Sequence, residues 1–228
     1  MESLLKYTVY RSNRTDIRIV LRSNGTLAVY CPQRCPKREI EKAVAKNYCQ
    51  LAKKHNSKAD ALFATENGTE TLPYLGKRFP IEYAETTMFS FSGESFTAPS
   101  GSTHEAIRTA YIELMRRIAK KHLAPTVAAL AEKHGFKFTA VRIKATCSRF
   151  GSCSSKGNIN LSLALMACDY EFIEYVILHE LCHTVHMNHS KDFYSLLSKV
   201  CPRHKEISDR GKAKYSDMVR AITYRPCP

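Results

Sequence analysis

The stretch that decides the fold runs from Phe172 to His189 and reads FIEYVILHELCHTVHMNH. Its centre, residues 179–183, has the pattern HExxH. Residues four apart on an α-helix lie on one face, one turn above the other, so His179 and His183 can bind the same zinc ion at about 2.0–2.1 Å. Glu180 is rotated by about 100° from His179. Its carboxylate can therefore reach a water beside the metal without being a ligand, as a general base requires.

The surrounding residues predict a buried helix rather than a solvated one with two surface histidines. Asp169 can cap the start of this helix, and Glu171 and Glu174 suit the positive end of its dipole. Apolar side chains surround most of the helix cylinder, namely Val176, Ile177, Leu178, Leu181 and Val185.

Two histidines compete to be the third metal ligand. On a straight helix His186 shares the face of His179, but it lies about 7 Å further along the axis than a metal between His179 and His183, which is too far for a bond. If the helix ends near His186, the chain can fold back and bring in His189, because Asn and His tolerate the left-handed conformation that ends helices. This geometry favours His189 as the ligand and His186 as a hydrogen-bonding neighbour.

The composition is that of a chain with a hydrophobic core. Of the 228 residues, 44% are hydrophobic and 25% are charged, which allows one large or two small domains. No apolar run reaches the roughly 18 residues of a membrane helix, and residues 1–12 lack the apolar region of a signal peptide. With nine scattered cysteines, these features predict reduced thiols in a cytoplasmic protein without a membrane segment. Cys31 and Cys35 have no second pair at zinc-ribbon spacing, so we expect no structural zinc there.

The net charge is +14, and the isoelectric point is near 9.4. The charge is spread along the chain rather than gathered in blocks. It favours encounters with nucleic acid or acidic substrates, and it is equally consistent with a solvated basic surface. Nucleic acid is thus an allowed partner without a clear binding motif, and nothing in the sequence indicates an oligomeric state.

The first hundred residues are predicted to form a β-rich part with one helix. Asn24-Gly25 is a strong signal for a hairpin turn. The turn-rich residues 98–102 mark the expected boundary between an accessory part, residues 1–100, and a catalytic domain, residues 101–228. By residue type and spacing, the helix is expected at residues 37–54 and the strands at residues 4–10, 17–21, 26–30, 72–75, 78–83, 86–91 and 95–98, the last four as two hairpins.

The predicted catalytic domain mixes helices and strands. Ser102 and Glu105 can form a capping box for a helix that runs to about His122. Pro125 suits the first turn of a second helix, and Gly135 suits the position just past its end. The remaining predicted elements are strands at residues 138–146 and 157–163 with a turn-rich loop between them, and helices at residues 191–200 and near 214–222.

Two motifs in this order resemble the YgjP-like metallopeptidases, relatives of the SprT-like proteases. The first reads SRFGSCSSKGNINLSLAL (residues 148–165), and the second reads YVILHELCHTVHMNHSKDFYSLL (residues 175–197). They match an Arg-aromatic-Gly-Ser-Cys-Ser loop, a strand ending in Ile-x-Leu, an HELxH helix, and a third His followed by a small residue. The aromatic residue is usually Trp, and here it is Phe150. The resemblance is strongest across residues 138–200.

The resemblance implies an α+β fold, in which the HExxH helix of a zincin-like core packs on a small sheet after a β-rich N-terminal part. It also implies a cytosolic enzyme with one zinc ion held by His179, His183 and His189. In this interpretation Glu180 activates a water for the hydrolysis of a peptide or protein substrate.

In such folds the strand before the helix often lies along the substrate, which would pair with it by strand addition. Residues 158–161 are the candidate strand. Asn158 and Asn160 are therefore candidate substrate-binding residues, together with Arg149 and His186. Candidates for stabilising an oxyanion are Arg149, His186, His204 and Tyr215.

Two other functions stay open. One is the metal-dependent hydrolysis of a nucleoside triphosphate, which the basic charge suits, although the chain lacks a Gly-x4-Gly-Lys-Ser/Thr phosphate loop. The other is a nucleic-acid-associated module with a structural metal, for which the sequence shows no clustered stripe of basic and aromatic residues.

Overall fold

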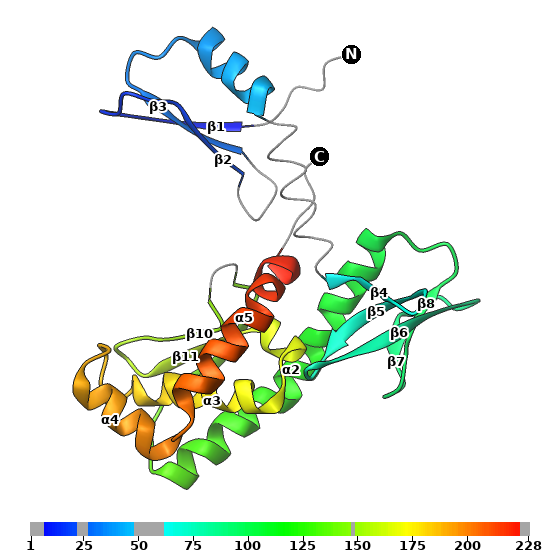
Figure 1. The fold of residues 1–228 in the computed structure, drawn as a ribbon, viewed down its shortest axis with the longest axis vertical. Coiled ribbons are helices and arrows are strands. Elements are labelled where there is room, and N and C mark those ends of the chain that lie inside the picture. The colour runs from blue at the N-terminus through cyan, green and yellow to red at the C-terminus, as the bar shows by residue number, and fades with distance from the viewer. Residues whose placement is uncertain (1–6, 22–26, 48–61, 147–148, 224–228) are drawn as a thin grey trace. The chain divides into compact units, whose positions relative to one another are not determined.

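The computed structural model describes residues 7–21, 27–47, 62–146 and 149–223 (Figure 1). The fold is mixed α+β, as predicted, and it divides into two compact units, residues 1–61 with 223–228 and residues 62–222. The predicted Asn24-Gly25 turn and the end of the helix predicted for residues 37–54 lie outside the described residues. In the described part, none of the helices combines the length and the apolar character needed to cross a membrane.

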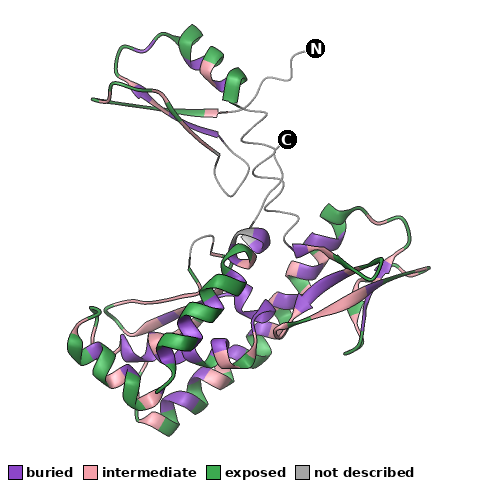
Figure 2. Ribbon diagram, viewed as in Figure 1, coloured by how far each residue is buried: buried purple, intermediate pink, exposed green. Residues whose placement is uncertain are grey.

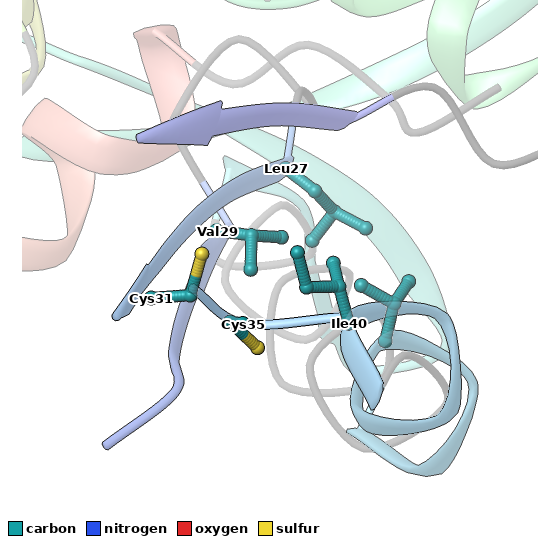
Figure 3. Close-up of a cluster of buried hydrophobic side chains, with 6 residues drawn as sticks. Leu27, Val29, Cys31, Cys35 and Ile40 are labelled. Atoms are coloured by element: carbon teal, nitrogen blue, oxygen red, sulfur yellow. The ribbon is translucent and has the colours of Figure 1, made fainter. Parts of the chain in front are cut away.

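The first unit is a three-stranded sheet with a helix against one face. β1 (Tyr7–Ser12) runs parallel to β3 (Leu27–Pro32), and β2 (Arg18–Leu21) pairs antiparallel to β3. A helix begins at residue 37 and is described to residue 47. Alternate residues of β3 face this helix, and the buried core between them (Figure 3) consists of Leu27, Val29, Cys31, Cys35, Ile40 and Val44. The two cysteines therefore act as small apolar core residues.

The second unit begins with a five-stranded sheet of order β4-β5-β6-β8-β7. β6 and β8 are parallel, and the other neighbours are antiparallel, in agreement with the two predicted hairpins. The strands are β4 (Ala64–Glu66), β5 (Thr69–Tyr74), β6 (Lys77–Ala84), β7 (Ser90–Phe91) and β8 (Phe96–Pro99).

This sheet belongs to the same compact unit as the helices that follow it, so the division between units falls after residue 61 and not in the turn-rich stretch beyond β8. The N–H of Leu75 donates to the carbonyl of Met166 at 2.9 Å. The hydroxyl of Tyr111 donates to the carbonyl of Pro73 at 2.6 Å. The turn-rich stretch is therefore a turn within one unit, and an accessory role for everything before it stays a prediction.

A single long helix, α2 (His104–His134), follows the sheet. Its N-cap is Thr103 and not Ser102, and Gly135 closes its far end with a φ of 73°. Pro125 lies inside α2, so the prediction that a second helix starts there is wrong. The helix continues because one buried stripe at four-residue spacing runs past the proline, formed by Tyr111, Met115, Ala119, Leu123 and Val127.

The remaining elements surround α3 (Tyr170–Cys182), the HExxH helix, which is buried along most of its length (Figure 2). A three-stranded sheet of order β10-β11-β9 packs against α3, and so do α2 and α4. These elements are β9 (Ala140–Lys144), β10 (Gly151–Cys153), β11 (Asn158–Ser162), the 3-10 helix η2 (Leu163–Ala167), α4 (Lys191–Val200) and α5 (His204–Thr223).

Two of these elements differ from the prediction. β10 lies in the stretch expected to be a loop, and it is a strand because it pairs antiparallel with β11. α5 begins at His204, well before the helix expected near residue 214. Ile207, Tyr215 and Val219 are buried, and they share one face of α5 because they are separated by multiples of four residues. This buried face begins at Ile207, which explains why the helix starts earlier than expected.

Gly211→Ala is expected to destabilise the protein, although alanine normally favours a helix. A Cβ at Gly211 would lie 2.0 Å from Cδ2 of Phe172, so α5 and α3 would have to separate. Such overpacking costs about 1–3 kcal/mol. In an unhindered helix the same change would instead stabilise by about 0.5–1 kcal/mol.

Urea unfolding of the full chain measures this difference. Ala213→Gly, at an exposed position of the same helix, is the control for helix propensity alone. A Gly211→Ala variant as stable as the wild type would contradict the close packing of the two helices.

Candidate metal centre

The start of α3 is fixed by Asp169. One carboxylate oxygen of Asp169 accepts a hydrogen bond from the N–H of Phe172 at 2.9 Å, as an N-cap does. Its other oxygen accepts one from the hydroxyl of Tyr215 at 2.8 Å. Tyr215 is thus engaged at the start of the helix, and it is absent from the lining of the cavity described below.

The end of α3 decides which histidines meet. The helix stops at Cys182 with His183 as its C-cap, earlier than the expected end near His186. The N–H of His186 then donates to the carbonyl of Cys182 at 2.9 Å, within a turn that leads toward α4. The N–H groups of Thr184 and Val185 donate to carbonyls three residues earlier, at 3.0 and 3.1 Å, which tightens the chain after the helix. Among the described residues, His186 is not part of the cluster formed by His179, His183 and His189.

This turn brings His189 beside His179 and His183. Their ligand nitrogens all lie within 4.8 Å of one another, and the ring centroids are 4.7–5.1 Å apart. Nε2 of His189 and Nε2 of His179 are 3.2 Å apart. Two nitrogens bound to one tetrahedral zinc would be about 3.4 Å apart, given bonds of about 2.05 Å. The donor set and its spacing fit one zinc ion.

Two neighbours orient the histidine rings. Nδ1 of His183 lies 3.0 Å from the carbonyl oxygen of His186; when it carries the proton it donates there and leaves Nε2 free for a metal. Phe193 of α4 is fully buried, and its ring centroid lies 4.5–5.0 Å from the centroids of His179, His183 and His189. The sequence predicts a helix at residues 191–200, but the contact of Phe193 with all three histidine rings becomes visible only in the structure.

Burial favours the neutral form of the site histidines. It is the main cause that lowers the pKa of His179 to about 3, with further contributions from the neighbouring His183 and His189. Burial also lowers the pKa of His183. Neutral imidazole is the form that binds a metal, so these shifts suit the proposed ligand role.

Glu180 is buried, with 5% of its surface exposed, and its Oε2 has no hydrogen-bond partner within the described residues. Burial raises the pKa of Glu180 to about 7, and the positive charge of Arg149 opposes the shift. A Cβ at Gly151 would lie 2.6 Å from Oε1, so the glycine of the Arg-Phe-Gly-Ser motif makes room for this carboxylate. A buried oxygen without a partner beside three imidazoles suits a group that hydrogen-bonds a water at the metal.

The site opens into a cavity of about 840 Å³. The cavity lies between α3, the chain around β10, the start of α4 and the inner face of α5. Arg149 and His204 line it as the sequence analysis allowed, whereas Asn158, Asn160 and His186 do not. Several lining residues belong to α5 and carry no motif that marks them in the sequence, among them Lys205, Ser208, Asp209, Lys212 and Ser216.

β11 cannot pair with a substrate strand, because its two edges already pair with β10 and β9. The expected strand addition along residues 158–161 is therefore wrong. Asn158 donates to Oγ of Ser154 at 3.3 Å, and Asn160 donates to Oγ of Ser152 at 3.4 Å, so both side chains brace the β10–β11 hairpin. The edge strand beside the candidate general base is β10.

Comparison with known proteins identifies a family for most of this chain. The family model described as YgjP-like, metallopeptidase domain, matches residues 15–213. The metallopeptidase zymogen abylysin of Pyrococcus abyssi is 30% identical over 40% of this chain and 93% of its own, with a TM-score of 0.38. The metallopeptidase zymogen jannalysin of Methanocaldococcus jannaschii is 22% identical over 40% of this chain and 95% of its own, with a TM-score of 0.37. No curated protein matches this chain. Because the family model covers most of the sequence, the chain belongs to the YgjP-like metallopeptidase domain family.

Proposed function

We propose that this protein is a zinc-dependent metallopeptidase that acts on peptides or proteins in the cytoplasm. Membership in a metallopeptidase family supports the reaction class. The observation that carries the proposal is the buried Glu180 carboxylate beside the cluster of His179, His183 and His189. The described cysteines are free thiols, which suits a reducing compartment. The described residues that line the cavity all come after residue 100, which supports residues 101–228 as the catalytic part.

Each residue of the centre has a distinct task. A zinc ion held by His179, His183 and His189 would supply a Lewis acid that polarises the scissile carbonyl and acidifies a water. Glu180 accepts a proton from the attacking water at its carboxylate and then donates it to the leaving amine as the C–N bond breaks. Gly151 has no side chain and therefore leaves room for that carboxylate against β10.

The hydrolysis of a nucleoside triphosphate is the second candidate. Arg149, Lys205 and Lys212 line the cavity beside the histidines, and a polyphosphate would suit three cations at this place. The cavity is equally suited to an acidic peptide, and the family match favours the peptidase.

We expect a chelator to abolish casein hydrolysis by the full chain and about one equivalent of zinc to restore it. Zinc content and casein cleavage are measured on the same samples, with UTP hydrolysis assayed in parallel. Casein cleavage that survives complete removal of the metal would contradict the proposal. Metal-dependent UTP turnover without casein cleavage would favour the second candidate.

A further inference from the structure

One wall of the cavity beside the histidine cluster is cationic. Lys205, Ser208, Lys212 and Ser216 follow one another at three- or four-residue steps, so they share the face of α5 that lines the cavity. Arg149, just before β10, contributes a third cation to the lining. Among the described residues of the lining, Asp209 is the only carboxylate besides the candidate general base.

Two arginines in or just before α5, outside the cavity lining, form ion pairs with glutamates, whereas no ion pair is found for the described cations of the cavity. Arg203 pairs with Glu206 at 2.7 Å and with Glu171 at 3.0 Å, and Arg210 also pairs with Glu171. Within the described ranges, Arg149, Lys205 and Lys212 form no ion pair. Their charges therefore stay available to a ligand in the cavity.

These cations share one cavity with the candidate reacting groups, because His179, Glu180 and His189 belong to the same lining. Arg149 lies two residues before Gly151, where the backbone passes against the carboxylate of Glu180. An anionic group held by these cations would thus lie in the same cavity as the candidate general base.

We propose that this cavity is a subsite for a carboxylate of the peptide substrate, held by Lys205, Lys212 and Arg149. The enzyme then prefers peptides that carry Asp or Glu, or end in a free carboxylate, next to the scissile bond. The proposal rests on the proposed peptidase function and adds a substrate class to it. A carboxylate binds to ammonium and guanidinium groups through charge-assisted hydrogen bonds, which a neutral amide of the same shape cannot replace.

The test uses quenched fluorescent peptides that differ only next to the scissile bond, with Glu, Gln or Lys there and both ends blocked. We expect kcat/KM to favour Glu over Gln by roughly tenfold, the size that one charged hydrogen bond supplies. Lys212→Gln and Lys205→Gln should each reduce that preference. Lys214→Gln is the matched control, because Lys214 lies on the same helix outside the cavity, 5.0 Å from the ring centroid of Tyr215. A fourth peptide, cut at its last bond and ending in a free carboxylate, distinguishes an end-group site from a side-chain site.

A second measurement separates this proposal from the proposed function. The same peptides are titrated into the zinc-loaded Glu180→Gln variant, with and without Lys212→Gln, and binding is followed by fluorescence anisotropy. Binding that favours Glu and needs Lys212, without cleavage by the wild type, would keep the subsite and overturn the peptidase. Equal cleavage of the Glu and Gln peptides would overturn the subsite and keep the peptidase. The carboxylate subsite would also be overturned if Lys214→Gln lost the preference for the Glu peptide as much as Lys212→Gln does. The same holds if UTP displaced both peptides and the protein showed no preference for Glu.

Discussion

Replacing Glu180 with glutamine is expected to lower peptide hydrolysis by at least about 10²-fold, the low end for losing general acid–base catalysis. Glutamine keeps the size of the side chain and part of its hydrogen bonding, but it cannot accept the proton of the attacking water. The three histidines proposed to hold the metal are unchanged, so zinc content should stay at the wild-type value. Stability should change little, because the amide occupies the same space against Gly151.

The matched control is Glu174→Gln, the same substitution at an exposed position of α3 outside the cavity. Its turnover should equal that of the wild type. Zinc content, thermal unfolding and turnover of one peptide are measured for all three proteins. A Glu180→Gln protein that binds zinc and turns over the peptide at the wild-type rate would leave the metal with a structural role only.

The cluster of His179, His183 and His189 could be predicted because its arrangement depends on local geometry. His179 and His183 are one helical turn apart in any helix, whatever packs around it. His189 depends on where α3 ends, and the limited reach of an imidazole was enough to prefer it over His186. The position of Gly151 against Glu180 could not be predicted, because it depends on how β10 lies beside α3.

The start of α5 and the strand β10 could not be predicted from the sequence, because both depend on tertiary contacts. The start of α5 is rich in charged residues, and its buried stripe is recognisable only once Gly211 and Tyr215 are seen to lie against Phe172 of α3. β10 has the sequence Gly-Ser-Cys, which has no preference for a strand, and it becomes one by pairing with β11. Pro125 led to the opposite error, because it predicts the start of a new helix where α2 continues. The buried stripe of α2 outweighs the hydrogen bond that proline removes.

The other large effect is expected at the third ligand, where His189→Ala should abolish stoichiometric zinc binding and His186→Ala should not. His189 supplies one of three imidazoles whose nitrogens lie within 4.8 Å of one another, and alanine leaves only those of His179 and His183. His186 takes part through its backbone carbonyl, which lies 3.0 Å from Nδ1 of His183 and which alanine retains.

Thermal unfolding with and without zinc gives a readout that does not depend on activity. Zinc at 100 times its Kd stabilises a protein by about 2.7 kcal/mol when it binds the folded state alone. The wild type and His186→Ala should show this upward shift in Tm, and His189→Ala should lose it together with its bound zinc. The reverse pattern, in which His186→Ala loses the shift and His189→Ala keeps it, would show that the turn after Cys182 delivers the other histidine to the metal.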